Sequence, residues 1–500
     1  MGFPPGWADA RVSDLCRPRW GRQHIAAQRS RYPLRFNPRD PSRRFPMSEL
    51  IHDLPDGILE WVEQTAEGRV THLHRHVARR EAWVVDVTRP DGSLVEGFLR
   101  LQREARGPDP RRLERETRIT QALGRCGIPV ARVHGWSPEL RATLFARDPG
   151  SADIDKLDDP ERQRAIMQDF MKGIARMHRL DLDALDLDDV MAARPKTAEE
   201  TALGSVDEIC AQWEHFLDGY QDPLTSYALD WLRRFVPKEV ARVSLVQGDT
   251  GPVNFMFQGD VVSSIVDWET GHWGDPMEDL GNILVREFYN PCGGLKGLFE
   301  LWAEETGIPY SRFAAQYYAV HQNVRGMIPI HYTSIHAHPR ESVASYLCYR
   351  YVGDRATCEM LAQAMDVELE RPEMPEDGGE PDILADSAIH AQDNDVRPRL
   401  TDPFARSRAE AVKTLIACMD RKRRYGPVLD AIEREELREL LGVRPDSASH
   451  GLTSLHAAIR ERSIADEPLI RYLARHAYRD EWLYAPAVAL YPARVWSEID

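Results

Sequence analysis

The stretch LVQGDTGPVNFMF at residues 245–257, followed by IVDWE at 265–269 and GDPMEDL at 274–280, decides the fold of this chain. Short apolar runs alternate here with Gly, Pro and Asp, a pattern typical of small buried strands joined by tight turns. Three polar side chains stand at the ends of these predicted strands: Asp249, Asn254 and Asp267.

These three side chains suit phosphoryl transfer. A carboxylate at Asp249 can orient an incoming hydroxyl or accept its proton, while Asn254 and Asp267 can hold Mg²⁺ against phosphate groups. Taken singly, each residue is more often a turn or helix-cap residue, because Asp and Asn favour both places. The ordered series GDxxxxN, an apolar strand ending in Asp and then GDPxxDL is much rarer, and it favours a catalytic site.

The residues upstream, 47–150, predict a small strand-rich lobe. The segments VTHLHRHV, EAWVVDVTR and SLVEGFLRLQ have the composition of strands, with a Pro-Asp-Gly turn at 90–92 between the last two. The helical pattern PRRLERETRITQALGRCG follows, and then two further extended segments, VARVHGW and RATLFARD.

Helical patterns dominate downstream of the small lobe. Residues 151–366 hold long amphipathic stretches such as ERQRAIMQDFMKGIARMHRL and are predicted as a helical catalytic lobe. Residues 367–400 are dense in acidic residues, Pro and Gly, the composition of a solvated linker. Residues 401–500 are predicted as a helical accessory domain, with Pro427 near the start of a helix and Gly442 just past its end.

The first 46 residues differ in composition from the rest. They hold ten Arg and three Asp, about +7, so the remainder of the chain carries −16 − 7, about −23. Two interpretations stay open: a targeting or interaction arm, or translated sequence upstream of a true start at Met47. The second is preferred because an ordinary helix-like opening follows Met47, and disorder over 1–46 is expected in either case.

Bulk composition excludes several classes of protein. With 42% hydrophobic and 29% charged residues and no long apolar run, the chain reads as globular and not membrane-spanning. Seven scattered cysteines without a CxxC spacing argue against a disulfide framework or zinc site and favour a reducing, cytoplasmic location. A net charge of −16 disfavours a nucleic-acid partner. The oligomeric state stays open.

The motif stretch resembles the aminoglycoside phosphotransferase-like kinases, which include choline kinases, macrolide kinases and kinase-like domains attached to some acyl-CoA dehydrogenases. The resemblance covers about 60–340. It implies an α+β, two-lobed protein-kinase-like fold with a small antiparallel-sheet lobe and a larger helical lobe, here followed by a small all-α module. It also implies ATP and Mg²⁺ as cofactors, with Asp249 as the catalytic residue and Asn254 and Asp267 as metal ligands.

The same resemblance implies a nucleotide-binding pair in the small lobe, a basic residue on a strand and a Glu on the next helix. Arg100 in GFLRLQ and Glu116 in LERETRI match these two positions. The alternative is that Arg100 is an ordinary surface residue and Glu116 an ordinary residue on a helix face. The chain departs from the family at three places. Gln247 replaces a His of the family. His76-Val77-Ala78-Arg79 replaces a phosphate loop that contains Gly and Ser. Arg100 carries a planar guanidinium with several N–H donors, where protein kinases have the compact charge of a Lys ammonium.

The expected function is ATP-dependent phosphate transfer to a hydroxyl of a small molecule. A hydroxyacyl-CoA or related catabolic alcohol is favoured, because the C-terminal run RRYGPVLDAIEREELRELLG resembles helical domains that accompany kinases near acyl-CoA metabolism. The alternatives are an aminoglycoside- or macrolide-type antibiotic kinase and a degenerate kinase-like binding module without turnover. The three polar site residues favour the enzyme, whereas the missing glycines of the phosphate loop favour the binding module.

Overall fold

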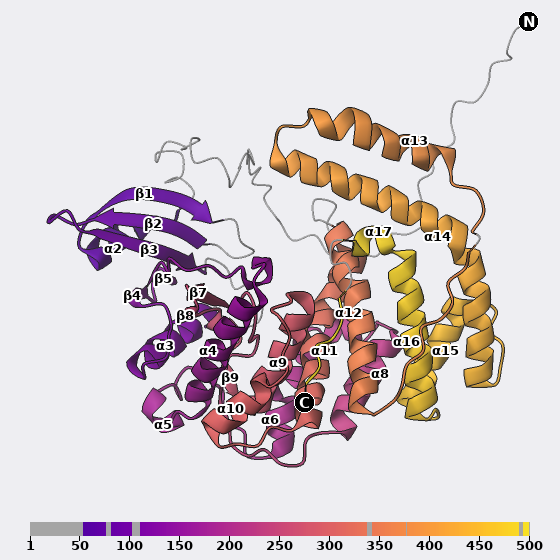
Figure 1. Cartoon of the computed structure of the whole chain (residues 1–500), viewed down its shortest axis with the longest axis horizontal. Helices are drawn as coiled ribbons and strands as arrows, with labels where there is room; N and C mark the ends of the chain where they lie inside the picture. The colour runs from indigo at the N-terminus through magenta and orange to yellow at the C-terminus, as the bar shows by residue number, and fades with distance from the viewer. Residues whose placement is uncertain are drawn as a thin grey trace, which may run out of the picture.

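The computed structural model of the protein describes residues 54–76, 82–102, 111–337, 343–376, 378–489 and 494–499. A sheet-rich lobe, indigo in Figure 1, lies against a mainly helical body, and the long C-terminal helices lie at the opposite end. The predicted α+β class, with a small antiparallel-sheet lobe, a larger helical lobe and further helices, is confirmed. The arm predicted at 1–46 and the candidate start at Met47 lie outside the described residues.

One antiparallel sheet in the strand order β1-β2-β3-β5-β4 forms the small lobe. Its elements are α2 (Ile58–Ala66), β1 (Arg69–His76), β2 (Ala82–Thr88), β3 (Leu94–Leu101), α3 (Arg112–Arg125), β4 (Val133–Ser137) and β5 (Ala142–Ala146). Along β2, Trp83, Val85 and Val87 are buried while the residues between them are half-buried, the alternation that a strand with one core face requires. Gly92, at φ 82°, makes the predicted turn between β2 and β3.

Four short strands form two separate antiparallel pairs that carry the motif residues: β6 (Ser244–Val246) with β9 (His272–Gly274), and β7 (Phe255–Gln258) with β8 (Val261–Ile265). A single helical turn, η2 (Trp268–Thr270), separates β8 from β9. The surrounding helices are α4 (Pro160–His178), α5 (Leu182–Leu185), α6 (Ala198–Gln212), α7 (Glu214–Leu217), α8 (Pro223–Arg234), α9 (Pro276–Tyr289), α10 (Leu298–Thr306), α11 (Arg312–His336) and α12 (Val343–Ala364). The predicted buried strands are therefore present, and helices enclose them.

The C-terminal helices are α13 (Ile383–Ala391), α14 (Pro403–Leu441), α15 (Ala448–Arg460), α16 (Asp466–Leu483) and α17 (Ala485–Val488). The prediction that Pro427 lies near a helix start is wrong, because α14 begins at Pro403 and continues through Pro427. Pro favours the first turn of a helix, where its missing N–H costs nothing, and in α14 Pro403 already takes that place. Gly442, at φ 75°, ends α14 as predicted. Helix α13 lies inside the predicted linker, and the domain boundaries stay a prediction.

Charged contacts join the C-terminal helices to the helical lobe. Asp466, at the start of α16, accepts hydrogen bonds from the Arg234 guanidinium at 2.7 and 2.8 Å. The Tyr227 hydroxyl donates to the same carboxylate at 3.1 Å. None of the helices in the described ranges is long and apolar enough to cross a membrane.

The end of the chain, residues 494–499, returns to α9 and is called the C-terminal strap below. Its Trp496 ring lies 4.6 Å from the Phe288 ring, centroid to centroid. The Ser497 hydroxyl donates to the carboxylate of Glu287, whose pKa is raised by burial. The strap therefore covers one face of α9.

Candidate active site

The predicted catalytic residues lie in and beside the loop between β6 and β7. Two glycines of this loop approach other segments too closely for any side chain. A Cβ on Gly248 (φ 80°) would lie 2.6 Å from the Thr270 carbonyl oxygen, and one on Gly251 (φ 138°) would lie 2.6 Å from Cβ of Arg286. Both φ angles also disfavour residues with a Cβ, so backbone geometry requires these glycines.

Asp279 of α9 holds the turn at the start of this loop. Its fully buried carboxylate accepts hydrogen bonds from the backbone N–H groups of Gln247 (3.1 Å) and Gly248 (3.1 Å). The Thr250 hydroxyl also donates to it, and His178 donates from Nε2 at 3.0 Å. A buried carboxylate with this many donors fixes the backbone around it.

Gln247 ties the two motif segments together. Its side-chain Nε2 donates to the carbonyl oxygens of Val266 (2.8 Å) and Asp267 (2.9 Å). Its Oε1 accepts from the backbone N–H of Asp249 (2.8 Å) and from the Thr250 hydroxyl (3.1 Å). An amide can donate and accept together, and Gln247 does both at the position where the family carries His.

The Asp249 carboxylate accepts hydrogen bonds from three side chains. Asn254 Nδ2 donates at 3.0 Å, Gln322 Nε2 at 3.1 Å and Arg286 Nε at 2.8 Å, with a second Arg286 N–H also engaged. The Asp249 side chain is 27% exposed, so it can be reached by a ligand. Sequence reasoning missed Arg286 and Gln322, which come from α9 and α11; the charge of Arg286 within the apolar run ILVREF was the available signal.

Asn254 and Asp267 lie at the same end of the β7–β8 hairpin, where the Val266 N–H donates to the Asn254 carbonyl at 3.0 Å. The Asn254 amide nitrogen is engaged by Asp249, which leaves its amide oxygen as the atom for a cation. Asp267 has φ 67°, an uncommon conformation that is often found at functional sites. One amide and one carboxylate suit Mg²⁺, which fills its remaining positions with phosphate oxygens and water. Among the described residues no group of three or more His, Cys, Asp or Glu is arranged to hold a metal.

The predicted nucleotide-binding pair is in contact. Arg100 on β3 and Glu116 on α3 form an ion pair at 3.2 Å, and both side chains are largely buried. Residues 77–79 of the altered phosphate loop lie outside the described residues, while His76 packs edge-on against Phe98. That Arg100 and Glu116 bind the phosphates of a nucleotide stays a prediction.

The substitution Asp279→Asn is expected to destabilise the protein by about 1–3 kcal/mol, because an amide turns an N–H group toward donors that need an acceptor. Asp279 of GDPMEDL thus braces the loop, whereas Asp275 caps α9 through the Met277 N–H. Thermal unfolding followed by circular dichroism measures the effect. Asp260→Asn, at an exposed turn, is the control, and an equal melting temperature for both variants would contradict the brace.

Comparison with known proteins gives similarity over part of the chain. Residues 78–313, slightly less than half of the chain, match the model of the phosphotransferase enzyme family. Mouse acyl-CoA dehydrogenase family member 10 is 24% identical over 235 residues, covering 43% of this chain and 21% of the mouse protein. Rat acyl-CoA dehydrogenase family member 11 is 24% identical over 241 residues, covering 44% and 27%. The chain thus spans about a quarter of the length of these relatives.

Among solved structures, a candidate aminoglycoside phosphotransferase from Ralstonia eutropha JMP134 is similar with a TM-score of 0.50 and 19% identity. The match covers 65% of this chain and 100% of that one, and at this identity it shows the fold alone. The two-lobed kinase-like fold expected from the sequence is therefore confirmed. Residues 78–313 thus resemble the phosphotransferase enzyme family, in agreement with the resemblance that the motif stretch carries.

Proposed function

We propose that the chain is an ATP- and Mg²⁺-dependent phosphotransferase that acts on a hydroxyl group of a small molecule. The observation that carries this proposal is the convergence of Asp249, Asn254 and Asp267 around one loop that Gln247 and Asp279 hold in place. Phosphoryl transfer depends mainly on such positioning and on charge neutralisation. When bound, Mg²⁺-ATP supplies the phosphoryl group.

The side chains take distinct roles in this proposal. Asp249 orients the acceptor hydroxyl and takes its proton, while Asn254 and Asp267 hold the metal. Arg100, fixed by Glu116, contacts nucleotide phosphates. Because Arg286 and Gln322 occupy the Asp249 carboxylate, the acceptor hydroxyl has to displace at least one of these donors.

For the acceptor, we favour a hydroxyacyl-CoA or a related catabolic alcohol. The names of the two curated relatives support this choice, since both are acyl-CoA dehydrogenase family members. The groups that contact Asp249 support it too, because they are an arginine and two amides. A polycationic aminoglycoside is better matched by additional carboxylates.

The test is to incubate the purified protein with ATP labelled at the γ-phosphate, Mg²⁺ and separate hydroxyacyl-CoA, aminoglycoside and macrolide panels. We expect the wild-type protein to transfer the labelled phosphate to a hydroxyacyl-CoA, and the Asp249→Asn variant to transfer none. Mass spectrometry verifies the phosphorylated product. If only an aminoglycoside or a macrolide received the phosphate, the acceptor would be an antibiotic and not a hydroxyacyl-CoA. ATP binding without transfer to any acceptor would favour the degenerate binding module, and no ATP binding would overturn the proposal.

A further inference from the structure

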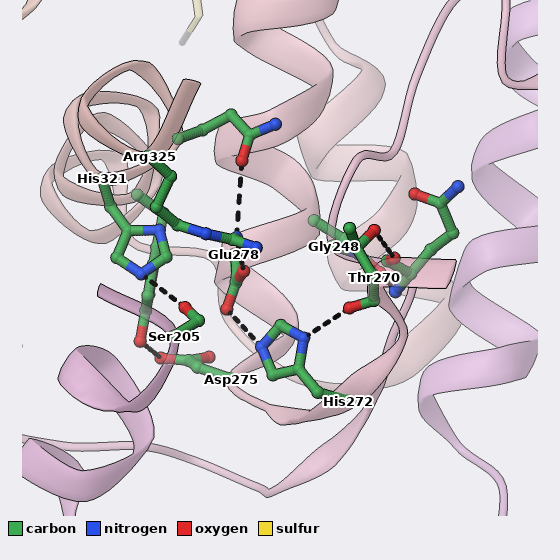
Figure 2. Close-up of polar contacts among 12 residues, drawn as sticks. Ser205, Gly248, Thr270, His272, Asp275, Glu278, His321 and Arg325 are labelled. Carbon is green, nitrogen blue, oxygen red and sulfur yellow. Dashed lines mark hydrogen bonds and ion pairs between the residues drawn. The ribbon is translucent and has the colours of Figure 1, made fainter. Parts of the chain in front are cut away.

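A polar cluster lies against the candidate active site and is not used in the proposed chemistry. Figure 2 shows its central residue, His272 on β9, between Thr270 and Glu278. His272 Nδ1 lies 2.9 Å from the Thr270 carbonyl oxygen, and Nε2 lies 3.0 Å from Oε2 of Glu278. The other members are Ser205, Asp275, Tyr318, His321 and Arg325.

The two contacts of His272 determine its proton count. A carbonyl oxygen and an ionised carboxylate only accept hydrogen bonds, so Nδ1 and Nε2 must both donate. A neutral imidazole has one N–H and can make only one of these bonds. The observed geometry is therefore that of an imidazolium.

The groups around His272 keep the proton on its ring. Glu278 is fully buried, and Arg325 donates to its Oε1 at 3.1 Å. Burial alone would raise the pKa of Glu278, but the cationic groups outweigh it and lower the pKa to about 2. For His272, burial lowers the pKa, and the Glu278 carboxylate and the hydrogen bonds outweigh that effect and raise it.

The remaining titratable groups of the cluster do not take this role. Burial lowers the pKa of His321 to about 3, so its ring is neutral and shares a 2.9 Å hydrogen bond with the Ser205 hydroxyl. Burial raises the pKa of Asp275 to about 7, and the Tyr318 hydroxyl donates to it at 3.3 Å. His272 is therefore the histidine of this cluster that carries charge.

His272 is connected to the catalytic loop by two routes. The Thr270 hydroxyl donates to the Gln247 carbonyl at 2.9 Å, and the Thr270 carbonyl, which His272 holds, lies against Gly248. His272 also pairs with Val246 across β9 and β6, one residue before the loop begins. The ring therefore joins α9, through Glu278, to the turn that carries Asp249.

We propose that His272 is a positioning residue whose imidazolium, bridging Glu278 and Thr270, holds the 247–249 turn in the geometry for phosphate transfer. The inference rests on the proposed function for its catalytic meaning. Loss of the ring proton breaks one of the two bonds and loosens the turn. The site is thus active while His272 is charged, and it weakens as pH rises past the point where His272 deprotonates.

The same geometry fixes the sign of the pH effect on stability. A histidine whose pKa is raised on folding contributes stability below its unfolded pKa of about 6.5 and loses it as pH rises through the folded value. His272→Gln should therefore lower the melting temperature most near pH 6, and the difference from wild type should shrink at alkaline pH. His450→Gln, at an exposed histidine on α15, is the matched control.

The decisive measurement is a pH titration of the full-length wild-type protein by NMR. We expect both ring nitrogens of His272 to show imidazolium shifts at pH 7, and the amide signals of Gly248 and Asp249 to move along the same titration curve. In transfer assays, His272→Gln should reduce kcat by about 10- to 100-fold, the scale of a small misplacement, and should lose the alkaline limb of the pH profile.

The inference would be overturned if the His272 ring carried a single proton at pH 7. It would also be overturned if the amide signals of Gly248 and Asp249 did not shift as His272 titrates. Neither observation involves phosphate transfer. If no acceptor is phosphorylated while the ring and loop titrate together, the proposed function fails and the coupling stands. If transfer occurs and His272→Gln keeps the wild-type pH profile, the coupling fails and the function stands.

Discussion

Asp249→Asn should lower kcat for ATP-dependent phosphate transfer by about 10²- to 10⁴-fold, the range that a lost general base commonly costs. The Asn side chain has nearly the same size, so Gln322 and Arg286 keep a neighbour of similar shape. Because Asp249 is assigned to the hydroxyl and not to the metal, the Kd of Mg²⁺-ATP should stay close to that of wild type. Steady-state kinetics and calorimetric titration of ATP measure the two quantities.

The control for this variant is Asp260→Asn, on the turn of the β7–β8 hairpin, where the carboxylate is exposed and pairs with Arg162. It makes the same chemical change at the opposite end of the β7–β8 hairpin from Asn254 and Asp267, away from the loop. Equal kcat values for the wild type and Asp249→Asn would exclude a catalytic role for Asp249. A large loss of ATP affinity in Asp249→Asn would instead assign this residue to the metal.

Asp267→Gly is expected to weaken Mg²⁺-dependent ATP binding by at least about 10- to 100-fold, because loss of an outer-shell partner alone costs that much metal affinity. Glycine is chosen because it removes the carboxylate and still permits the φ of 67°. Titrations of ATP with and without Mg²⁺ isolate the metal-dependent part. Binding without Mg²⁺ should change little.

A matched control for this change exists in the same lobe. Asp186, which follows α5, has φ 54° and is exposed, so Asp186→Gly makes the same substitution in the same backbone conformation away from the site. It should leave both titrations at the wild-type values. Equal Mg²⁺ dependence in wild type and Asp267→Gly would exclude Asp267 as a ligand.

The parts of the fold that were predictable from sequence depend on local patterns. The first three strands of the small lobe and the turn at Gly92 follow from alternation and from turn residues close in sequence. The short strands around the motif follow from apolar runs interrupted by Gly and Asp. Pro427 was misplaced because a helix packed along its length can continue through a proline, which local propensity does not reveal.

The site was predictable to the extent that its residues share one stretch of chain. Asp249 and Asn254 are five residues apart and contact each other as the motif suggests. Arg286 and Gln322 lie 37 and 73 residues beyond Asp249, and only the packing of α9 and α11 against the loop brings them to it. The charge state of His272 likewise depends on contacts from neighbouring elements, which no spacing rule encodes.

The C-terminal strap has a consequence for how this protein can be divided experimentally. A fragment cut at residue 366, the predicted end of the helical lobe, loses the Trp496 ring that covers Phe288 and the Ser497 hydroxyl bonded to Glu287. Both uncovered residues are neighbours of Arg286 on α9. Such a truncation therefore uncovers the helix that supplies Arg286 to Asp249.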